Sequence, residues 1–314
     1  MPPKIIVIAG PTATGKTRLG IELAKRHRGE IVSADSMQLY RRMDIGTAKA
    51  SAQERAEAPH HMLDVAEPEE DYSAARYVEE AARCCEEILK RGKLPILVGG
   101  TGLYIDSLVS GRDFAPRDER DEALREKLSA EYETIGGEAM LQRLREIDPE
   151  RAEKLHPADK RRIVRAIEIF TLTGVTATQH DAETKARPPR FDALTVVLNY
   201  ADRAALYERI DSRVDEMIRR GLFEEVEGLL RGGLSERCTA MQAIGYKEAA
   251  MALRGELSRE EAAERIKLNS RRYAKRQMTW FNKYENALRI HWQGAPELGA
   301  ALEQIEREME KRGF

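Results

Sequence analysis

The sequence has few cysteines, few aromatic residues and almost no net charge. Its three cysteines are Cys84, Cys85 and Cys238. An adjacent pair and a distant third thiol supply neither a disulfide framework nor the CxxC spacing of a metal site. Lys and Arg number 52 against 54 Asp and Glu, so any nucleic-acid partner would need a local basic patch. His60 and His61 lack zinc-ligand spacing, and no zinc site is expected.

Long apolar runs are also absent. No segment approaches the roughly 20 apolar residues of a membrane helix, so no membrane partner is expected. The first strand-like run begins at residue 4, which leaves no room for a signal peptide. We therefore expect a cytoplasmic monomer. At 314 residues, the chain suits one large domain or a domain that carries an insertion.

Residues 10–17 read Gly-Pro-Thr-Ala-Thr-Gly-Lys-Thr, a GxxxxGKT phosphate loop. Glycines let its backbone N–H groups turn toward an anion, Lys16 adds a positive charge, and Thr17 can hold Mg²⁺. The motif is also that of ATP-binding proteins, and it leaves open whose phosphate is bound. The candidate diphosphate-binding residues are Gly10, Pro11, Thr12, Ala13, Thr14, Gly15, Lys16 and Thr17.

Five short, mostly apolar runs predict buried parallel strands: residues 4–9, 30–33, 94–98, 194–200 and 288–292. Helical spacing of apolar residues follows the first run at 17–26 and precedes the third at 74–91. Alternating strands and helices, with a phosphate loop after the first strand, predict an α/β fold. We expect the P-loop NTPase-like type, a three-layer parallel sheet with an all-helical insertion domain.

The alternation stops between residues 117 and 187, where helical patterns at 121–132, 138–147 and 158–172 occur without a credible strand. We therefore expect a helical insertion at 117–187 within a core formed by 1–116 and 188–314. Four further helices are expected in the core after its fourth strand, at 203–219, 223–230, 240–253 and 259–284.

Asp35 follows the second expected strand. Because the carboxyl ends of parallel strands face the ligand crevice, this carboxylate is aimed near the phosphate loop. It could accept a proton or help to hold Mg²⁺. Ser36 and Gln38 could hydrogen-bond a base edge. The alternative, an aspartate that caps a turn or helix, is equally compatible with the spacing.

The third expected strand ends in Gly-Gly-Thr-Gly at residues 99–102, the glycine turn. Small residues permit close approach of a ligand, and Thr101 can donate to a phosphate oxygen. The alternative is a tight strand-to-helix connection. This strand lacks the terminal aspartate of a Walker B element, which argues against an ordinary ATPase.

Arg209 and Arg213 lie four residues apart, on one face of an expected helix. Two neighbouring guanidinium groups suit a diphosphate. Acidic residues at 208, 211 and 215 make a solvated, charge-paired face the favoured alternative on spacing alone.

Residues 265–283 contain seven basic residues and no acid, with Tyr273, Trp280 and Phe281 interleaved. Such a segment suits a phosphate backbone with stacked bases, although a solvated helix with buried aromatics is the alternative. A second basic patch lies at 160–165. Two patches in a near-neutral chain favour a nucleic-acid partner.

Five segments together resemble the bacterial tRNA dimethylallyltransferase family. They are the phosphate loop, Ser33-Ala-Asp-Ser-Met-Gln-Leu-Tyr40, Gly99-Gly-Thr-Gly-Leu-Tyr104, Gln242-Ala-Ile-Gly-Tyr-Lys247 and Arg271-Arg-Tyr-Ala-Lys-Arg-Gln277 with Trp280-Phe281. They occur in this order, and the resemblance extends from residue 4 to about residue 292. Some eukaryotic relatives carry a C-terminal zinc finger, which the cysteine count does not lead us to expect here.

The resemblance implies transfer of a dimethylallyl group from dimethylallyl diphosphate to tRNA. The acceptor is the exocyclic amino nitrogen (N6) of the adenosine next to the anticodon on its 3′ side, and diphosphate leaves. Asp35 would be the general base, Lys16 and Thr101 would assist, and Thr17 would hold Mg²⁺. The insertion would grip the anticodon stem-loop.

The tRNA contacts that the resemblance and the basic patches imply form three groups. They are Asp35, Ser36, Met37, Gln38 and Thr101 at the target adenosine; Arg161, Arg162, Ile163, Val164 and Arg165 in the insertion; and Gln242, Ala243, Ile244, Gly245, Tyr246, Lys247, Arg271, Arg272, Lys275 and Arg276 in the core. Three rival functions stay open: a small-molecule kinase, an enzyme that prenylates free adenine nucleotides, and a nucleotide-gated RNA-binding module.

Overall fold

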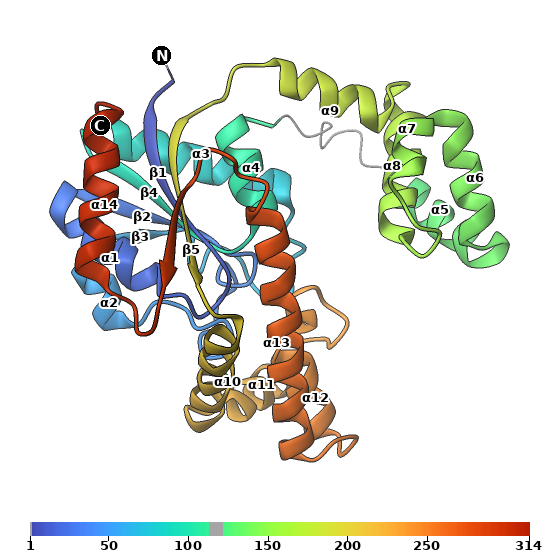
Figure 1. Ribbon diagram of the computed structural model, residues 1–314. Helices are drawn as coiled ribbons and strands as arrows, with labels where there is room; N and C mark the ends of the chain where they lie inside the picture. The colour runs from blue at the N-terminus through green and yellow to red at the C-terminus, as the bar shows by residue number, and fades with distance from the viewer. Residues whose placement is uncertain (1, 113–121) are drawn as a thin grey trace. The chain divides into compact units, whose positions relative to one another are not determined.

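The computed structural model describes residues 2–112 and 122–314 (Figure 1). The expected domain boundary at 117 and the helix start expected at 121 lie outside the described residues. The chain divides into two compact units, residues 1–109 with 190–314 and residues 110–189. The described residues contain no helix that is long and apolar enough to cross a membrane.

The first unit is built on a six-stranded parallel sheet in the order β3-β2-β4-β1-β5-β6, so the predicted α/β class is confirmed. Its strands are β1 Lys4–Ala9, β2 Gly29–Ala34, β3 His60–His61, β4 Leu94–Gly99, β5 Asp192–Tyr200 and β6 Leu288–Trp292. The five longer strands match the predicted runs. β3 was missed because two residues are too short to show a periodic pattern.

Helices cover both faces of this sheet, and a group of helices extends from one end of it (Figure 1). They are α1 Lys16–His27, α2 Ala52–Glu57, α3 Ala74–Lys90, α4 Gly102–Ser110, α10 Arg203–Arg219, α11 Leu222–Arg231, α12 Tyr246–Leu253, α13 Arg259–Phe281 and α14 Leu298–Lys311. The expected helix at 240–253 is in fact a 3₁₀ turn, Ala240–Gln242, followed by α12. Gly245 separates them with a φ of 98°, which a continuous right-handed helix excludes.

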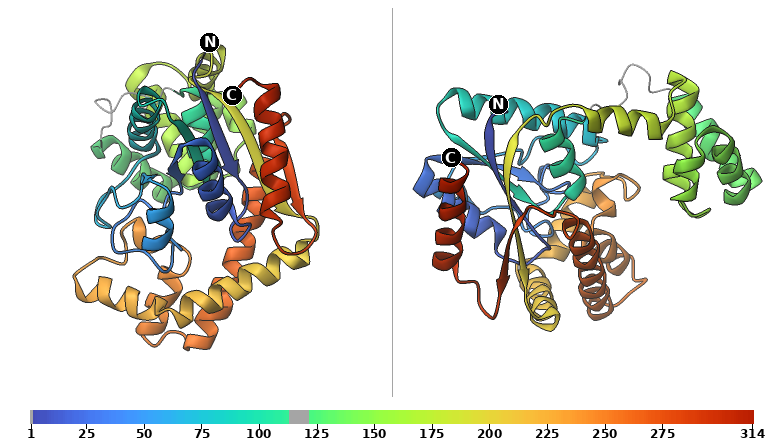
Figure 2. Two further views of the ribbon diagram at one scale, coloured as in Figure 1. Left: turned by 90° about the vertical axis from the view of Figure 1, so that its left-hand side faces the viewer. Right: turned by 45° about the horizontal axis from the view of Figure 1, so that its top comes forward.

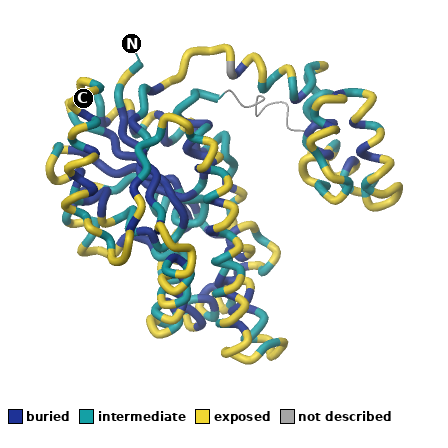
Figure 3. Tube along the Cα trace, viewed as in Figure 1, coloured by how far each residue is buried: buried dark blue, intermediate teal, exposed yellow. Residues whose placement is uncertain are grey.

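The core explains why the strands are apolar on both faces. Alternate residues such as Ile6 and Ile8 pack with Leu19 of α1 and Leu302 of α14. The intervening residues point to the other face, where Figures 1 and 2 show α3, and they are also fully buried. Figure 3 shows the burial concentrated in the central strands. The sheet is therefore covered by helices on both sides.

Three adjacent strands bring the candidate segments to one edge of the sheet. Ala9 and Ala34 both pair with Gly99, the last residue of β4. The phosphate loop begins immediately after Ala9, Asp35 follows Ala34, and the glycine turn begins at Gly99. The strand register thus brings together segments that lie far apart in the sequence.

The second unit is helical in its described part. They are α5 Glu122–Ile135, α6 Gly137–Ile147, α7 Pro149–Glu153, α8 Lys160–Thr173 and α9 Ala177–Ala186. Its core includes Leu128, Met140, Leu144 and Ile163. The buried Asp148 caps α7 and accepts a hydrogen bond from the Thr178 hydroxyl at 2.7 Å, which ties α7 to α9.

Candidate active site

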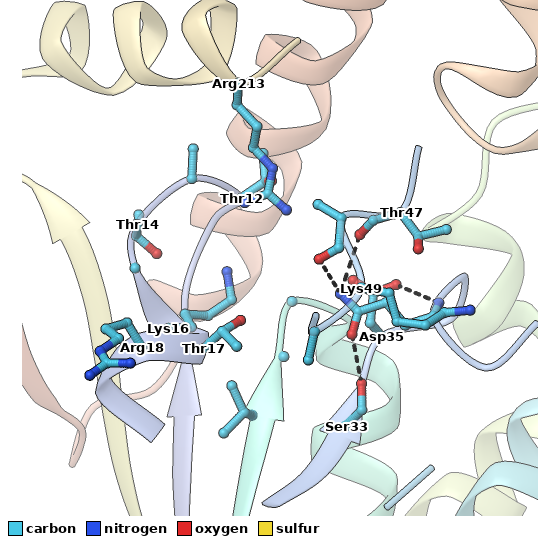
Figure 4. A pocket seen from close by; sticks show the side chains of 18 of the residues that line it. Thr12, Thr14, Lys16, Thr17, Arg18, Ser33, Asp35, Thr47, Lys49 and Arg213 are labelled. Atoms are coloured by element: carbon cyan, nitrogen blue, oxygen red, sulfur yellow. Dashed lines mark hydrogen bonds between the residues drawn. The ribbon is translucent and has the colours of Figure 1, made fainter. Parts of the chain in front are cut away.

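A cavity of about 380 Å³, here called the loop cavity, opens where the three strands end. The phosphate loop from Thr12 to Thr17, Asp35 and Arg213 line it, together with Tyr273 and Gln277. Figure 4 shows Lys16 and Arg213 extending toward the same space from opposite sides. The sheet edge, α10 and α13 therefore contribute to one site.

The phosphate loop curls at positions that restrict its sequence. Gly10 has a φ of 144°, and a Cβ there would lie 2.3 Å from the Leu198 carbonyl oxygen. Gly15 caps the start of α1 with a φ of 82°, and Ala13 also has a positive φ, 66°. The Thr14 hydroxyl donates to the Pro11 carbonyl at 2.9 Å. This backbone directs the N-terminus of α1 at the cavity, as anion binding requires.

Lys16 and Arg213 are two of the cations that line the loop cavity. Burial and the nearby Arg213 lower the pKa of Lys16 to about 7, although Asp35 acts in the opposite direction. Burial likewise lowers the pKa of Arg213. The Lys16 amine donates to the Pro11 carbonyl at 2.6 Å, and neither cation forms an ion pair with a carboxylate in the described part of the chain. An anion in the cavity would favour the charged form of both groups.

Diphosphate binding is expected to weaken by up to about tenfold per pH unit as the pH rises above about 7. The bound anion raises the pKa of Lys16, so binding takes up a proton above the pKa of the free protein. Below about 7 the amine is already charged, and this contribution disappears.

Lys16→Arg, whose guanidinium stays charged, should flatten the decline in diphosphate affinity with rising pH. Calorimetric affinities for Mg²⁺-diphosphate between pH about 6 and 9 test this. Equal slopes in both proteins would contradict it.

Asp35 combines the two roles that the sequence left open. Its Oδ1 accepts hydrogen bonds from the backbone N–H of Met37 at 2.9 Å and of Gln38 at 3.4 Å, so it does cap a turn. Its Oδ2 has no hydrogen-bond partner among the described residues, and the side chain lines the cavity. One oxygen therefore fixes the carboxylate while the other is available to a ligand.

Thr101 and Gln38 are engaged within the protein. The Thr101 hydroxyl accepts from the Ser36 backbone N–H at 3.1 Å, and Thr101 does not line either cavity described here. The Gln38 amide accepts from the Ser33 hydroxyl at 3.1 Å and donates to the Thr47 carbonyl at 3.3 Å. Both side chains hold the segment after β2 in place.

The glycine turn owes its composition to protein contacts. A Cβ at Gly99 would lie 2.1 Å from the Ala34 carbonyl oxygen, one at Gly100 would lie 2.2 Å from the Gln277 amide nitrogen, and one at Gly102 would overlap Trp280. Gly99 and Gly100 also line the loop cavity. The expectation that these glycines serve close ligand approach is therefore incomplete, because strand β2 and helix α13 already require them.

A second cavity of about 270 Å³, here called the apolar cavity, adjoins the first. The two share Thr12, Asp35, Thr47, Arg213, Met217 and Tyr273. Its other walls include Ile210, Val214, Ile244 and Ile266. Asp35 thus lies where a polar, cation-lined space meets an apolar one.

The structure separates the two arginines of α10. Arg213 lines both cavities, whereas Arg209 is exposed and lines neither. Residues four apart on a helix differ by about 40° in direction, which is enough to place one at the cavity and one outside. The expected pair at the diphosphate is thereby reduced to Arg213.

Several residues expected at RNA are placed elsewhere. Tyr246 is fully buried, and its hydroxyl donates to Glu225 at 2.5 Å, so the expected RNA contact was wrong. Ile163 and Val164 are buried in the core of the helical unit, and the same correction applies to them. Ile163 and Val164 lie on the face of α8 that packs in this core, whereas Arg161 and Arg162 are exposed.

The remaining predicted RNA contacts are mixed. Gln242, Ala243, Ile244 and Arg276 line the apolar cavity, as do Ser36 and Met37. Gly245 donates its backbone N–H to Glu248, Arg165 pairs with buried Glu168 and Arg271 pairs with Asp211. Lys247, Arg272 and Lys275 are exposed, and Gln242 and Arg276 are also exposed.

Tyr273, Gln277 and Lys49 are among the residues that line the site but were not selected from the sequence. Tyr273 lines both cavities, and burial, with Asp35 nearby, raises its pKa to about 12. Gln277 and Lys49 line the loop cavity. Tyr273 and Gln277 lie within the basic segment, where their four-residue spacing could have indicated a common helix face. Lys49 donates to the Tyr40 carbonyl and to the carboxylates of Asp44 and Asp64, which lie outside any regular helix or strand spacing.

The family comparisons agree with this geometry. The model of the IPP transferase family matches residues 38–284, and that of isopentenyl transferases matches residues 3–66. The chain is 50% identical over 283 residues to a tRNA dimethylallyltransferase of Caldanaerobacter subterraneus, covering 90% of each chain.

Solved structures give the same result. One is the tRNA isopentenylpyrophosphate transferase of Bacillus halodurans, with a TM-score of 0.72, 39% identity and coverage of 99% of this chain and 98% of that chain. Another is a eukaryotic dimethylallyltransferase acting on tRNA, with a TM-score of 0.81, 31% identity and coverage of 98% and 78%. With a family model over most of its length and relatives at this identity, the chain belongs to the tRNA dimethylallyltransferase family.

Proposed function

We propose that this protein transfers the dimethylallyl group of dimethylallyl diphosphate to the N6 amino nitrogen of the tRNA adenosine that follows the anticodon on its 3′ side. One observation carries the proposal: Asp35 stands where the cation-lined loop cavity meets the apolar cavity, with Oδ2 available. A base at such a junction can take a proton from a nucleophile that enters through one cavity while the electrophile is held in the other. The substrates named for the relatives fit this arrangement.

The donor diphosphate binds at the phosphate loop. Backbone N–H groups at the start of α1, the Lys16 amine and the Arg213 guanidinium meet its negative charge. When the bond from the allylic carbon to the diphosphate oxygen breaks, the electron pair leaves with the diphosphate. These fixed positive groups stabilise the larger charge of the departing diphosphate more strongly than the smaller charge of the intact diphosphate ester.

Mg²⁺ fits the same cavity as a partner of the donor. Among the described residues no group of three or more His, Cys, Asp or Glu could hold a metal ion. Mg²⁺ that keeps water and phosphate oxygens as most of its ligands does not need such a cage. Thr17, which lines the cavity, would supply a hydroxyl oxygen. The ion would neutralise part of the diphosphate charge.

The adenine enters from the apolar cavity, where Met37 and Ile244 offer apolar surface and Ser36 offers polar atoms. Its amino group is a weak nucleophile because the lone pair is delocalised into the ring. As the new carbon–nitrogen bond forms, Asp35 Oδ2 accepts one amino proton, a contribution of about 10²- to 10⁴-fold. Met37 and Gln38 N–H groups keep the carboxylate in position.

The tRNA is held through its phosphates, while the adenine is drawn out of the stacked loop at a cost of about a few kcal/mol. Arg272 and Lys275 on α13, and Arg161 and Arg162 on α8, are exposed and suit phosphate contacts. The helical unit would grip the anticodon stem-loop. Its five helices share a core of their own, as a separate gripping element requires.

The proposal is tested by mass spectrometry of nucleosides from unmodified tRNA incubated with the protein, dimethylallyl diphosphate and Mg²⁺. We expect adenosine that carries one dimethylallyl group in place of a hydrogen. A parallel incubation with free adenine nucleotides examines the nearest rival. Modification of free nucleotides but not of tRNA, or of neither, would contradict the proposal.

A further inference from the structure

The side chain of Gln277 joins two backbone segments at the centre of the site. Its Oε1 accepts a hydrogen bond from the Thr12 N–H at 3.0 Å, and its Nε2 donates to the Gly100 carbonyl at 2.9 Å. The residue is only 6% exposed. The amide offers an acceptor and a donor in one plane, whereas a carboxylate or an ammonium could satisfy one partner at most.

The segment that Gln277 holds is conformationally demanding. Thr12 lies between Gly10, with a φ of 144°, and Ala13, with a φ of 66°, a value that L residues rarely adopt. A loop in such a conformation persists when the surroundings fix it. Because the Thr12 N–H points at Gln277, it does not face the anion. The bond therefore acts as an anchor that leaves the later N–H groups, at the start of α1, for the phosphate.

The same helix is fastened to the core one turn further on. The Trp280 indole N–H donates to Asp106 of α4 at 2.9 Å, and its ring occupies the space where a Cβ of Gly102 would lie. Tyr273, one turn before Gln277, lines both cavities. Helix α13 thus presents Tyr273, Gln277 and Trp280 to the core at helical spacing, and carries the exposed Arg272 and Lys275 elsewhere on its surface.

We propose that Gln277 is a positioning residue. Its side chain holds the phosphate loop in the conformation that binds diphosphate, and it does so from α13, the helix that also carries the RNA-binding cations. The inference rests on the proposed function in that diphosphate is the anion bound. It predicts a selective defect. Loss of the amide impairs the donor site, whereas the RNA-binding face of the same helix stays intact.

The first experiment measures binding of Mg²⁺ with inorganic diphosphate by calorimetry, together with tRNA affinity, for wild type, Gln277→Met and Thr279→Ala. Methionine keeps the length of the side chain without either hydrogen bond. Thr279, exposed on the same helix, is the matched control. We expect Gln277→Met to weaken diphosphate binding about tenfold, the typical effect of losing a hydrogen bond to a buried group. Its tRNA affinity should stay within about twofold of wild type, and Thr279→Ala should change neither.

A double-mutant cycle tests the contact from its other end, and its single variant Gly100→Ala, which keeps Gln277, serves if Gln277→Met does not fold. A Cβ on Gly100 would lie 2.2 Å from Gln277 Nε2 and would displace the amide. Gly100→Ala alone should therefore weaken diphosphate binding. It should have a smaller effect in the Gln277→Ala background, where the space is free, so the two effects are not additive.

The outcomes separate the two ideas. If wild type binds diphosphate and Gln277→Met binds it equally well, the positioning role is overturned while the proposed function stands. Parallel losses of diphosphate and tRNA affinity would show a general distortion of α13 and would also overturn it. If wild type binds no diphosphate, both fail.

Discussion

Asp35→Asn is expected to slow prenyl transfer by at least about 100-fold, with tRNA affinity nearly unchanged. Asparagine keeps the size of the side chain, and its carbonyl oxygen can still accept from the Met37 N–H, which now holds Oδ1 at 2.9 Å. Its amide nitrogen has no lone pair that can take the adenine proton. The turn after β2 should therefore survive while the base is lost.

Single-turnover rates with saturating tRNA and donor measure this effect without interference from product release. Glu79→Gln on α3 is the control, because Glu79 is an exposed carboxylate paired with Arg83 away from the site. A near-normal rate for Asp35→Asn would remove Asp35 as the base. A large loss of tRNA affinity would instead show that the carboxylate serves recognition.

Lys16→Ala is expected to weaken binding of the donor diphosphate by about 10- to 100-fold, the effect of losing one charge-assisted hydrogen bond. Lys16 extends into the loop cavity and has no carboxylate partner in the described chain, so its charge is available to the ligand. Arg213 and the loop N–H groups remain in the variant, so diphosphate binding should be weakened but not abolished.

Calorimetric titration with Mg²⁺-diphosphate checks this value. Lys25→Ala is the control, because Lys25 lies on the same helix but pairs with Glu57 at the surface. Unchanged affinity in Lys16→Ala would show that the loop cavity does not hold the donor diphosphate. The tRNA affinity of the variant should match that of wild type.

Much of the fold could be predicted from local pattern. The five longer strands are short, mostly apolar runs, and β1, β2 and β4 are buried on both faces, a signal that needs no knowledge of distant contacts. The phosphate loop is specified within eight residues, and it adopts the expected turn at Gly10 and Gly15. The strand ends then place Asp35 at the same edge, because parallel strands share a direction.

The parts that escaped prediction depend on long-range contacts. Gln277 is 265 residues from Thr12, and nothing local indicates that its amide meets that N–H. Tyr246 belongs to a motif that resembles an RNA-binding segment, yet its burial follows from packing on Glu225 and the loop at Gly46. A motif thus marks a segment that matters without revealing whether a given side chain faces a ligand or the interior.

The rival kinase function is weakened by the same geometry. β4 ends in Gly99 and continues into the glycine turn, so no carboxylate follows this strand where a Walker B aspartate would stand. The cavity that adjoins the phosphate loop is apolar, lined by Ile210, Val214 and Ile266. These features suit a prenyl donor and an adenine ring better than the phosphate-accepting substrate of a kinase.

The central claim is that the phosphate loop holds diphosphate as the leaving group of a prenyl donor, and that no ATP is consumed. The most direct measurement is the stoichiometry of diphosphate released to dimethylallyl adenosine formed in tRNA, in a reaction free of ATP. The account predicts one diphosphate for each modified adenosine and the same rate when ATP is omitted. An absolute requirement for ATP, or release of orthophosphate in place of diphosphate, would contradict it.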